Sequence, residues 1–188
     1  MKLIRALSKP LYSSSFILGN MLPNFFWTRY ISKSKKFGLN KKYFILSFDC
    51  DTEKDIEVVE EVNNKLTNLN ILASYAVPGE LLKLGSDVYL KLSKSGSEFL
   101  NHGYLSHTSY FEENCSYIST LFYDKLTNKE VRDDIIRGHN NIIKVLGKVP
   151  IGFRTPHFGT YQKPHQLKLL YSILSCLLYT SPSPRDLW

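Results

Sequence analysis

The chain has 188 residues, of which 43% are hydrophobic and 22% are charged, a composition typical of one folded globular domain. Its formal net charge is +7, but residues 1–42 hold nine Lys/Arg and no acid, so the remainder carries 15 basic against 17 acidic residues. The positive charge therefore belongs to the N-terminal segment and argues against a nucleic-acid partner. Three cysteines without metal-ligand spacing exclude a disulfide framework.

Residues 1–42 are predicted to form a basic N-terminal extension. The segment starts like a signal peptide, but Ser13–Ser15, Asn20 and Pro23 interrupt its apolar stretch, and no small-residue cleavage site follows. It also lacks the run of about 18 apolar residues that a membrane span needs. The favoured interpretation is an arm that packs on the main domain. The alternative is peripheral contact of the aromatic residues between 25 and 30 with an anionic membrane surface, and the cytoplasm is the favoured compartment.

The main domain is predicted to alternate strands and helices. Short apolar runs rich in aromatic and β-branched residues predict four buried strands: Lys42–Phe48, Ile71–Val77, Ser97–Asn101 and Pro150–Arg154. Helical patterns lie between them, at residues 53–70, 78–84, 87–93 and 127–147. Thr127 and Glu130 fit a capping box for the last helix, which we expect to end at Gly147. This order predicts an α/β fold with parallel strands, either an open sheet or a barrel.

The end of the chain is predicted not to be native. A helical pattern of apolar residues between 167 and 174 runs directly into a Ser/Pro cluster without a cap. The stretch Cys176–Asp186 closely resembles the in-frame translation of a sequencing-library adaptor, and such segments are excluded from fold reasoning. We therefore expect a partial domain over residues 43–175, a non-native tail over residues 176–188, and a gene that continues beyond Ser175.

Polar residues gather where three of the predicted strands end. Asp49 and Asp51 follow the first strand, "NHGYLSHTSY" follows the third, and "FRTPHFG" follows the fourth. Because the carboxyl ends of parallel strands meet at one edge, these side chains are predicted to share one site. Cys50, between the two aspartates, is predicted to be a small buried hydrophobic residue and not a nucleophile.

The residue types at this edge indicate a metal centre. Asp51, His102 and His107 form a three-ligand set, the usual number for a catalytic divalent ion that keeps one position open. Asp49 beside the ion is a candidate general base, and the permanently charged Arg154 is suited to orient it.

Each of these residues also has a purely structural interpretation. Aspartates after a strand are often turn or N-cap residues, and two nearby histidines are often ordinary surface or core residues. Arg154 beside Pro156 can be a simple turn contact, and His139 in the middle of a helix is predicted to be exposed. The ordered appearance of the polar residues after successive strands favours the metal site.

The segments "SFDCDTE", "NHGYLSHT" and "GFRTPHFGT" resemble three motifs of the polysaccharide deacetylase family, which includes chitin and peptidoglycan deacetylases. The resemblance extends over about residues 43 to 161 and implies the N-terminal part of a distorted (β/α) barrel that truncation leaves unclosed. It implies a hydrolase that removes acetyl groups from N-acetylated amino sugars of a poly- or oligosaccharide. The resemblance implies that Asp49 is the general base and that Arg154 positions it. It implies that Asp51, His102 and His107 bind zinc or another divalent ion, and that the backbone N–H of His157 binds the oxyanion.

Two features depart from the family pattern. His102 and His107 are five residues apart, where four is the common spacing, so a loop or bulge must bring the two imidazoles together. The later motifs lie beyond Ser175, so we expect the fragment to be inactive without them. The alternatives are a metal-dependent hydrolase of another amide, such as a cyclic amide or ureide, and a non-catalytic carbohydrate-binding pseudoenzyme. The oligomeric state is not predicted.

Overall fold

The computed structural model describes residues 14, 17, 19–41, 44–157 and 159–177. The chain forms two units, Met1–Phe44 and Ile45–Trp188, and each is described by itself. In the first unit, helix α3 spans Pro23–Lys36, with proline in its first turn and three lysines in its last turn, where positive charge favours the helix dipole. Among the described residues, no helix combines the length and the apolar composition that crossing a membrane requires.

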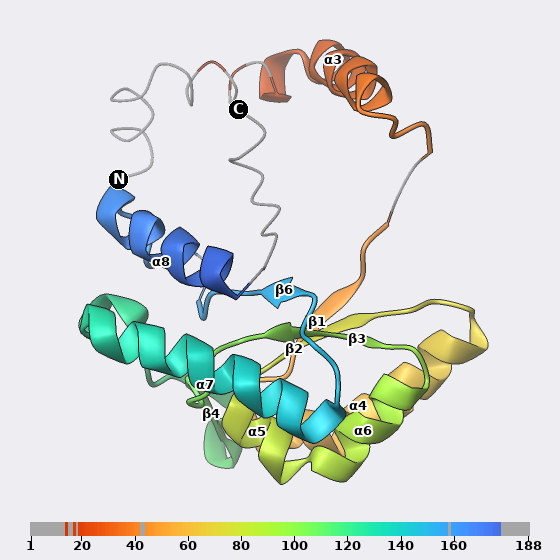
Figure 1. Cartoon of the computed structure of the whole chain (residues 1–188). Coiled ribbons are helices and arrows are strands. Elements are labelled where there is room, and N and C mark those ends of the chain that lie inside the picture. Colours follow the sequence, from red (N-terminus) through yellow and green to blue (C-terminus); the bar gives the residue numbers. More distant parts are fainter. Residues whose placement is uncertain (1–13, 15–16, 18, 42–43, 158, 178–188) are drawn as a thin grey trace. The chain divides into compact units, whose positions relative to one another are not determined.

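The second unit is built on four parallel strands in the order β1-β2-β3-β6 (Figure 1). Their bounds are Ser47–Asp49 for β1, Ser74–Val77 for β2, Glu98–Asn101 for β3 and Gly152–Phe153 for β6. The paired residues at their carboxyl ends are Asp49 with Ala76, Val77 with Asn101, and Asn101 with Phe153. All four strands therefore end at one edge of an unclosed sheet, and the predicted parallel α/β class is confirmed.

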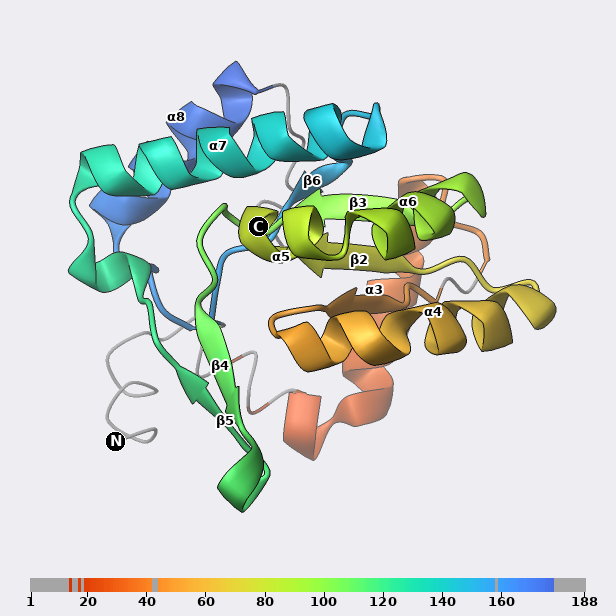
Figure 2. The same ribbon diagram turned by 90° about the horizontal axis from the view of Figure 1, so that it is seen from below.

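Helices cover this sheet and supply most of the core. Their bounds are Glu53–Asn68 for α4, Gly79–Leu84 for α5, Ser86–Lys94 for α6, Asn128–Leu146 for α7 and Pro164–Cys176 for α8. Figure 1 shows α4, α5, α6 and α7 on one side of the sheet. Their apolar faces meet β2 and β3 in the main core, which includes Val59, Tyr75, Leu82, Tyr89, Leu92, Phe99 and Ile142. A second cluster joins α7 to α8, which lie side by side in Figure 2, and includes Val131, Ile135, Leu170, Ile173 and Leu174.

The predicted ends of α7 are confirmed. Thr127 is the N-cap, and its N–H donates to Glu130 Oε2 at 2.7 Å while the Glu130 N–H donates to Thr127 Oγ1 at 3.3 Å. At the other end Gly147 adopts the left-handed conformation with φ 67°, which glycine enters without a steric penalty. The helix is therefore fixed at both ends, and it hydrogen-bonds through Asp134 and the Ile135 carbonyl to the segment after β3 and to Asn101.

The first predicted strand is wrong in its extent. Only Ser47–Asp49 is strand, Lys42 and Tyr43 lie outside the described residues, and Phe44 and Ile45 are 84% and 83% exposed. The paired register of β1 and β2 begins with Ser47 and Ser74, and before it only Leu46 is held, because its carbonyl accepts the Ser74 N–H and its side chain packs against the core.

Two further features of the second unit differ from expectation. Strands β4 (Thr108–Phe111) and β5 (Ser116–Ser119) form an antiparallel hairpin that the sequence did not predict, because this two-stranded ribbon lies outside the core and shows no apolar run (Figure 2). His139 was predicted to be exposed but is buried, because α7 is packed both on the sheet side and against α8. The predicted domain boundaries at residues 42 and 175 stay predictions, and residues 178–188 of the tail lie outside the described residues.

Candidate metal centre

Asp51 lies in the short link between β1 and α4, and its side chain is not used to cap the helix. Thr52 is the N-cap of α4, and the Asp55 carboxylate accepts the backbone N–H groups of Asp51 and Thr52 at 2.9 and 2.8 Å. Asp55 therefore performs the capping role that was the structural alternative for the two aspartates. The Asp51 carboxylate remains available at the edge where the strands end.

The structure brings Asp51, His102 and His107 together. The Nε2 atoms of His102 and His107 lie 3.3 and 3.1 Å from Asp51 Oδ1, and one ligand atom from each residue falls within 4.8 Å of the others. His102 and His107 are each 1% exposed, and their imidazole rings meet edge to face, with ring centroids 4.5 Å apart. The residues between the two histidines form an irregular loop, which is how the five-residue spacing allows both rings to face one carboxylate.

The orientation of His102 is fixed by its second ring nitrogen. Its Nδ1 donates to the backbone carbonyl of Arg154 at 2.7 Å. Because a carbonyl oxygen only accepts, Nδ1 carries the proton in the neutral ring, and the Nε2 lone pair is directed towards Asp51. This is the arrangement that metal-ligating histidines usually have, with the far nitrogen bound to a carbonyl or carboxylate.

The donor set fits a divalent cation. Asp51 Oδ1 and both ring nitrogens of His107 are buried without a hydrogen-bond partner among the described residues. Buried polar atoms are normally paired, and unpaired ones cost free energy, so these atoms point to a ligand that satisfies them. Burial by itself raises the pKa of Asp51, but in the metal-free site the imidazoles of His102 and His107, when protonated, outweigh burial through their charge and hydrogen bonds and hold this pKa well below its ordinary value. The carboxyl group is therefore ionised, as a metal ligand must be.

Asp49 lies beside this triad at the end of β1 and is paired with Arg154. The Arg154 guanidinium donates from Nη1 to Asp49 Oδ1 and from Nη2 to Ser47 Oγ, the latter at 2.7 Å. The pair joins β1 to the segment after β6, across the edge of the sheet. The Asp49 and Arg154 side chains are 30% and 19% exposed, so Asp49 is held in place while it stays accessible to water.

His157 lies next to His107, on the segment that follows β6. Its backbone has a left-handed conformation with φ 60°, an uncommon state for a residue with a side chain. The ring packs edge to face on His107 at 5.2 Å, and its Nε2 donates to the Leu121 carbonyl at 3.0 Å. The side chain is thus anchored in the segment after the hairpin, and its ring lies against His107.

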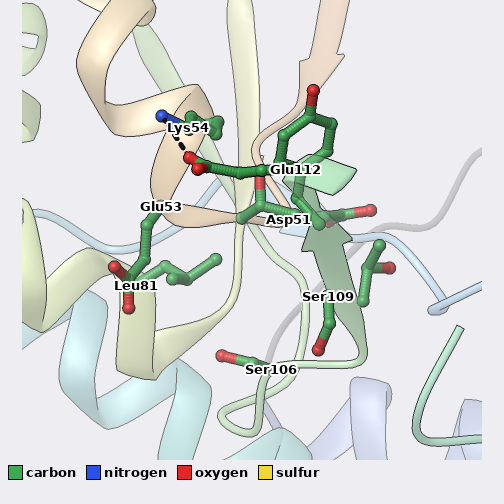
Figure 3. A pocket seen from close by; sticks show the side chains of 10 residues that line it. Asp51, Glu53, Lys54, Leu81, Ser106, Ser109 and Glu112 are labelled. Carbon is green, nitrogen blue, oxygen red and sulfur yellow. Dashed lines mark ion pairs between the residues drawn. The ribbon is translucent and has the colours of Figure 1, made fainter. Parts of the chain in front are cut away.

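A groove of about 420 Å³ opens beside Asp51 (Figure 3). Its lining combines the start of α4, Leu81 of α5, the loop before β4, β4 itself and the turn that follows it. The lining residues are Asp51, Thr52, Glu53, Lys54, Leu81, Ser106, Thr108, Ser109, Tyr110 and Glu112. Lys54 and Glu112 form an ion pair at 3.0 Å that joins α4 to the hairpin tip. Ser106, Thr108, Ser109 and Tyr110 belong to the polar segment that the sequence places after the third strand, but the hairpin that carries the last three of them was not predicted.

The sequence comparison decides the family. The profile described as Polysaccharide deacetylase matches residues 37–169, which is more than half of the chain. The chain belongs to the polysaccharide deacetylase family. A search of curated proteins found no match.

Solved structures of this family share the fold. The Bc1960 peptidoglycan N-acetylglucosamine deacetylase matches with a TM-score of 0.57 and 23% identity, over 73% of this chain and 55% of its own. A family 4 carbohydrate esterase from Streptomyces lividans matches with a TM-score of 0.55 and 19% identity, over 73% and 60%. BA3943 from Bacillus anthracis, a family 4 (CE4) pseudoenzyme, matches with a TM-score of 0.55 and 16% identity, over 72% and 42%. The chain thus spans about half the length of these family members.

Proposed function

We propose that this chain carries the metal site of a carbohydrate N-deacetylase, a hydrolase that removes acetyl groups from N-acetylated amino sugars of a poly- or oligosaccharide. The observation that carries the proposal is the Asp51–His102–His107 triad beside the Asp49–Arg154 pair: its imidazoles are buried, and Asp51 Oδ1 and both His107 ring nitrogens have no hydrogen-bond partner in the described part of the chain. The family to which the chain belongs supports the reaction type. The peptidoglycan N-acetylglucosamine deacetylase among the similar structures supports the substrate class.

Zinc is the proposed ion, because one carboxylate and two imidazoles are a common protein donor set for a catalytic zinc. When bound, such an ion supplies Lewis acidity and lowers the pKa of water in the site. His102 and His107 would hold it through Nε2, and Asp51 through Oδ1. The hydrogen bond from His102 Nδ1 to the Arg154 carbonyl keeps one of these ligands in the required tautomer.

The remaining residues have roles in the hydrolysis itself. Asp49 accepts a proton from the attacking water, and Arg154 keeps its carboxylate oriented towards the site. The backbone N–H of His157 donates to the amide oxygen as negative charge develops there. The water oxygen adds to the carbonyl carbon, the C–N bond breaks, and the proton that Asp49 accepted passes to the leaving nitrogen, so that acetate and a free amino sugar form.

Metal content tests the proposal in this chain. Asp51→Ala and His102→Ala should each abolish stoichiometric zinc binding, measured by elemental analysis after dialysis. Asp133→Ala and His165→Ala are matched controls, because both residues are exposed on helices, and these variants should keep their zinc. Zinc content that is unchanged in the first two variants would refute the proposal.

Activity is tested in a longer protein that contains this segment, because the chain covers only about half of the related structures. Acetate release from chitooligosaccharides, lost on Asp49→Asn, supports the deacetylase. Hydrolysis of small cyclic amides without acetate release would instead support the other amide hydrolase. Binding of chitooligosaccharides without turnover would support a pseudoenzyme. The cytoplasmic location, and the alternative of membrane contact through residues 1–42, stay predictions.

A further inference from the structure

The loop between the two histidines needs support from outside, because five residues of separation match neither a helical turn nor a strand. Residues 103–106 have no helix or strand assignment, and Gly103 has φ 81°. The direction in which His102 and His107 present their rings therefore depends on where this loop is held. The structure fixes the loop at two places, one on α5 and one on α7.

The contact from α7 is the Asp134 carboxylate. Asp134 is 3% exposed, and its Oδ1 accepts the backbone N–H groups of Tyr104 and Leu105 at 3.1 and 2.8 Å. Its Oδ2 accepts the hydroxyl of Tyr123 at 2.6 Å. Burial, and then the charge of Asp134, raise the pKa of Tyr123 well above its ordinary value, so this hydroxyl remains a donor. Both oxygens of the carboxylate are therefore used, and two of the three bonds go to the histidine loop.

Helix α5 also holds this loop. The N–H groups of Gly79 and Glu80 donate to the carbonyls of Gly103 and Tyr104 at 3.0 and 2.9 Å. The Glu80 carboxylate accepts the Ser106 N–H at 2.8 Å. The loop is thus hydrogen-bonded by two helices, but only the contact from α7 depends on a buried charged side chain.

Helix α7 also packs closely against the loop between the two histidines. A Cβ atom at Gly103 would overlap the Asp134 carboxylate, and a Cβ atom at Gly138 of α7 would overlap the Gly103 carbonyl and the Asn101 side chain. Asn101, which directly precedes His102, donates from Nδ2 to the Ile135 carbonyl of α7 at 2.9 Å. The backbone of α7 therefore lies directly against the residues next to the first ligand.

We propose that Asp134 is a positioning residue of the metal centre: by binding the Tyr104 and Leu105 amides, it sets the geometry in which His102 and His107 meet one ion. This inference rests on the proposed function. Asp134 does not contact the ion or the substrate, and it acts through the loop. The role depends on hydrogen-bond geometry, because both loop contacts are made by one oxygen to backbone donors.

Three substitutions separate geometry from charge. Asp134→Ala removes both loop bonds and should weaken zinc binding about 10- to 100-fold, the usual effect of losing a group that orients a metal ligand. Asp134→Asn keeps an oxygen for the two amides and should bind zinc within about threefold of the wild type. Asp134→Glu keeps the charge but displaces the oxygens by one methylene group, and it should bind more weakly than Asp134→Asn.

Asn63→Ala is the matched control for lost stability. Asn63 is also buried, at 4% exposure, and its side chain hydrogen-bonds to Tyr75, Ser95 and Ser97, none of which belongs to the histidine loop. This variant should lower the unfolding temperature of the metal-free protein and leave the zinc affinity unchanged.

Zinc affinity is measured by competition with a chromophoric chelator, and site geometry by the visible spectrum of the Co²⁺-substituted protein. We expect an altered Co²⁺ spectrum in Asp134→Ala and Asp134→Glu but not in Asn63→Ala. Wild-type zinc affinity in folded Asp134→Ala, or an equal loss in Asn63→Ala, would overturn the inference. If Asp134→Ala does not fold, wild-type affinity in Asp134→Glu overturns it. A wild-type chain that binds no zinc refutes the proposed function itself, whereas binding that needs Asp51 but not Asp134 refutes only this inference.

Discussion

The Asp49–Arg154 pair allows a quantitative test of the site's geometry in the metal-free protein. The perturbation is a double-mutant cycle with Asp49→Asn and Arg154→Met, which removes the charge of each partner separately and then of both. The two side chains are 30% and 19% exposed, so the pair lies between a surface ion pair and a buried one. Surface pairs contribute about 0.2–1 kcal/mol, and hydrogen bonds to charged groups about 1.5–3 kcal/mol.

From these values we expect a coupling free energy of about 1–2 kcal/mol between Asp49 and Arg154. Arg154→Met alone should cost about 2–3 kcal/mol, because it also removes the hydrogen bond to Ser47. The assay is urea unfolding of the four proteins, followed by fluorescence. The pair formed by Lys91 and Glu60, which are 64% and 39% exposed, is the matched control and should show a coupling of no more than about 0.5 kcal/mol. A coupling at Asp49–Arg154 no larger than that of the control would refute the view that Arg154 fixes the base.

Two further predictions concern buried groups outside the triad. Burial is the main reason that the pKa of Cys50 is raised to about 12. In the native protein a thiol reagent should therefore label the exposed Cys115 and Cys176 and spare Cys50 until urea is added. Fast labelling of Cys50 in the native protein would contradict its burial. Burial lowers the pKa of His139, so its contribution to stability is present above the ordinary histidine value of about 6.5 and is lost as the pH falls through the lowered folded-state value. The free energy of unfolding should therefore fall more steeply from pH 7 to pH 5 in the wild type than in His139→Gln, and parallel profiles would show that this histidine is not the cause.

The sequence predicted which polar residues lie together at the edge of the sheet better than it predicted the strands that carry them. Asp51, His102 and Arg154 were found because residues at the carboxyl ends of parallel strands share an edge, and the register of β1, β2, β3 and β6 brings these ends into line. The first strand was predicted too long because an apolar run indicates burial, whereas Phe44 and Ile45 have no strand beside them.

Other parts of the site could not be found in the sequence for physical reasons. The hairpin β4–β5 lacks an apolar run because it does not pack in the core, so its contribution to the groove gave no periodic signal. Asp134 is a polar residue in an amphipathic helix, and only the three-dimensional path of the histidine loop makes it a buried acceptor. The exposure expected for His139 failed for a related reason, since the second packed face of α7 comes from α8, far along the chain.

The coordination of a bound zinc ion tests the central claim most directly. X-ray absorption spectroscopy of the zinc-loaded wild-type chain should show two imidazole ligands and at least one oxygen ligand, and His107→Ala should lose stoichiometric zinc binding as Asp51→Ala and His102→Ala do. That result would establish that histidines five residues apart bind one ion together with Asp51. Stoichiometric zinc in His107→Ala, or a wild-type spectrum without two imidazole ligands, would contradict the account.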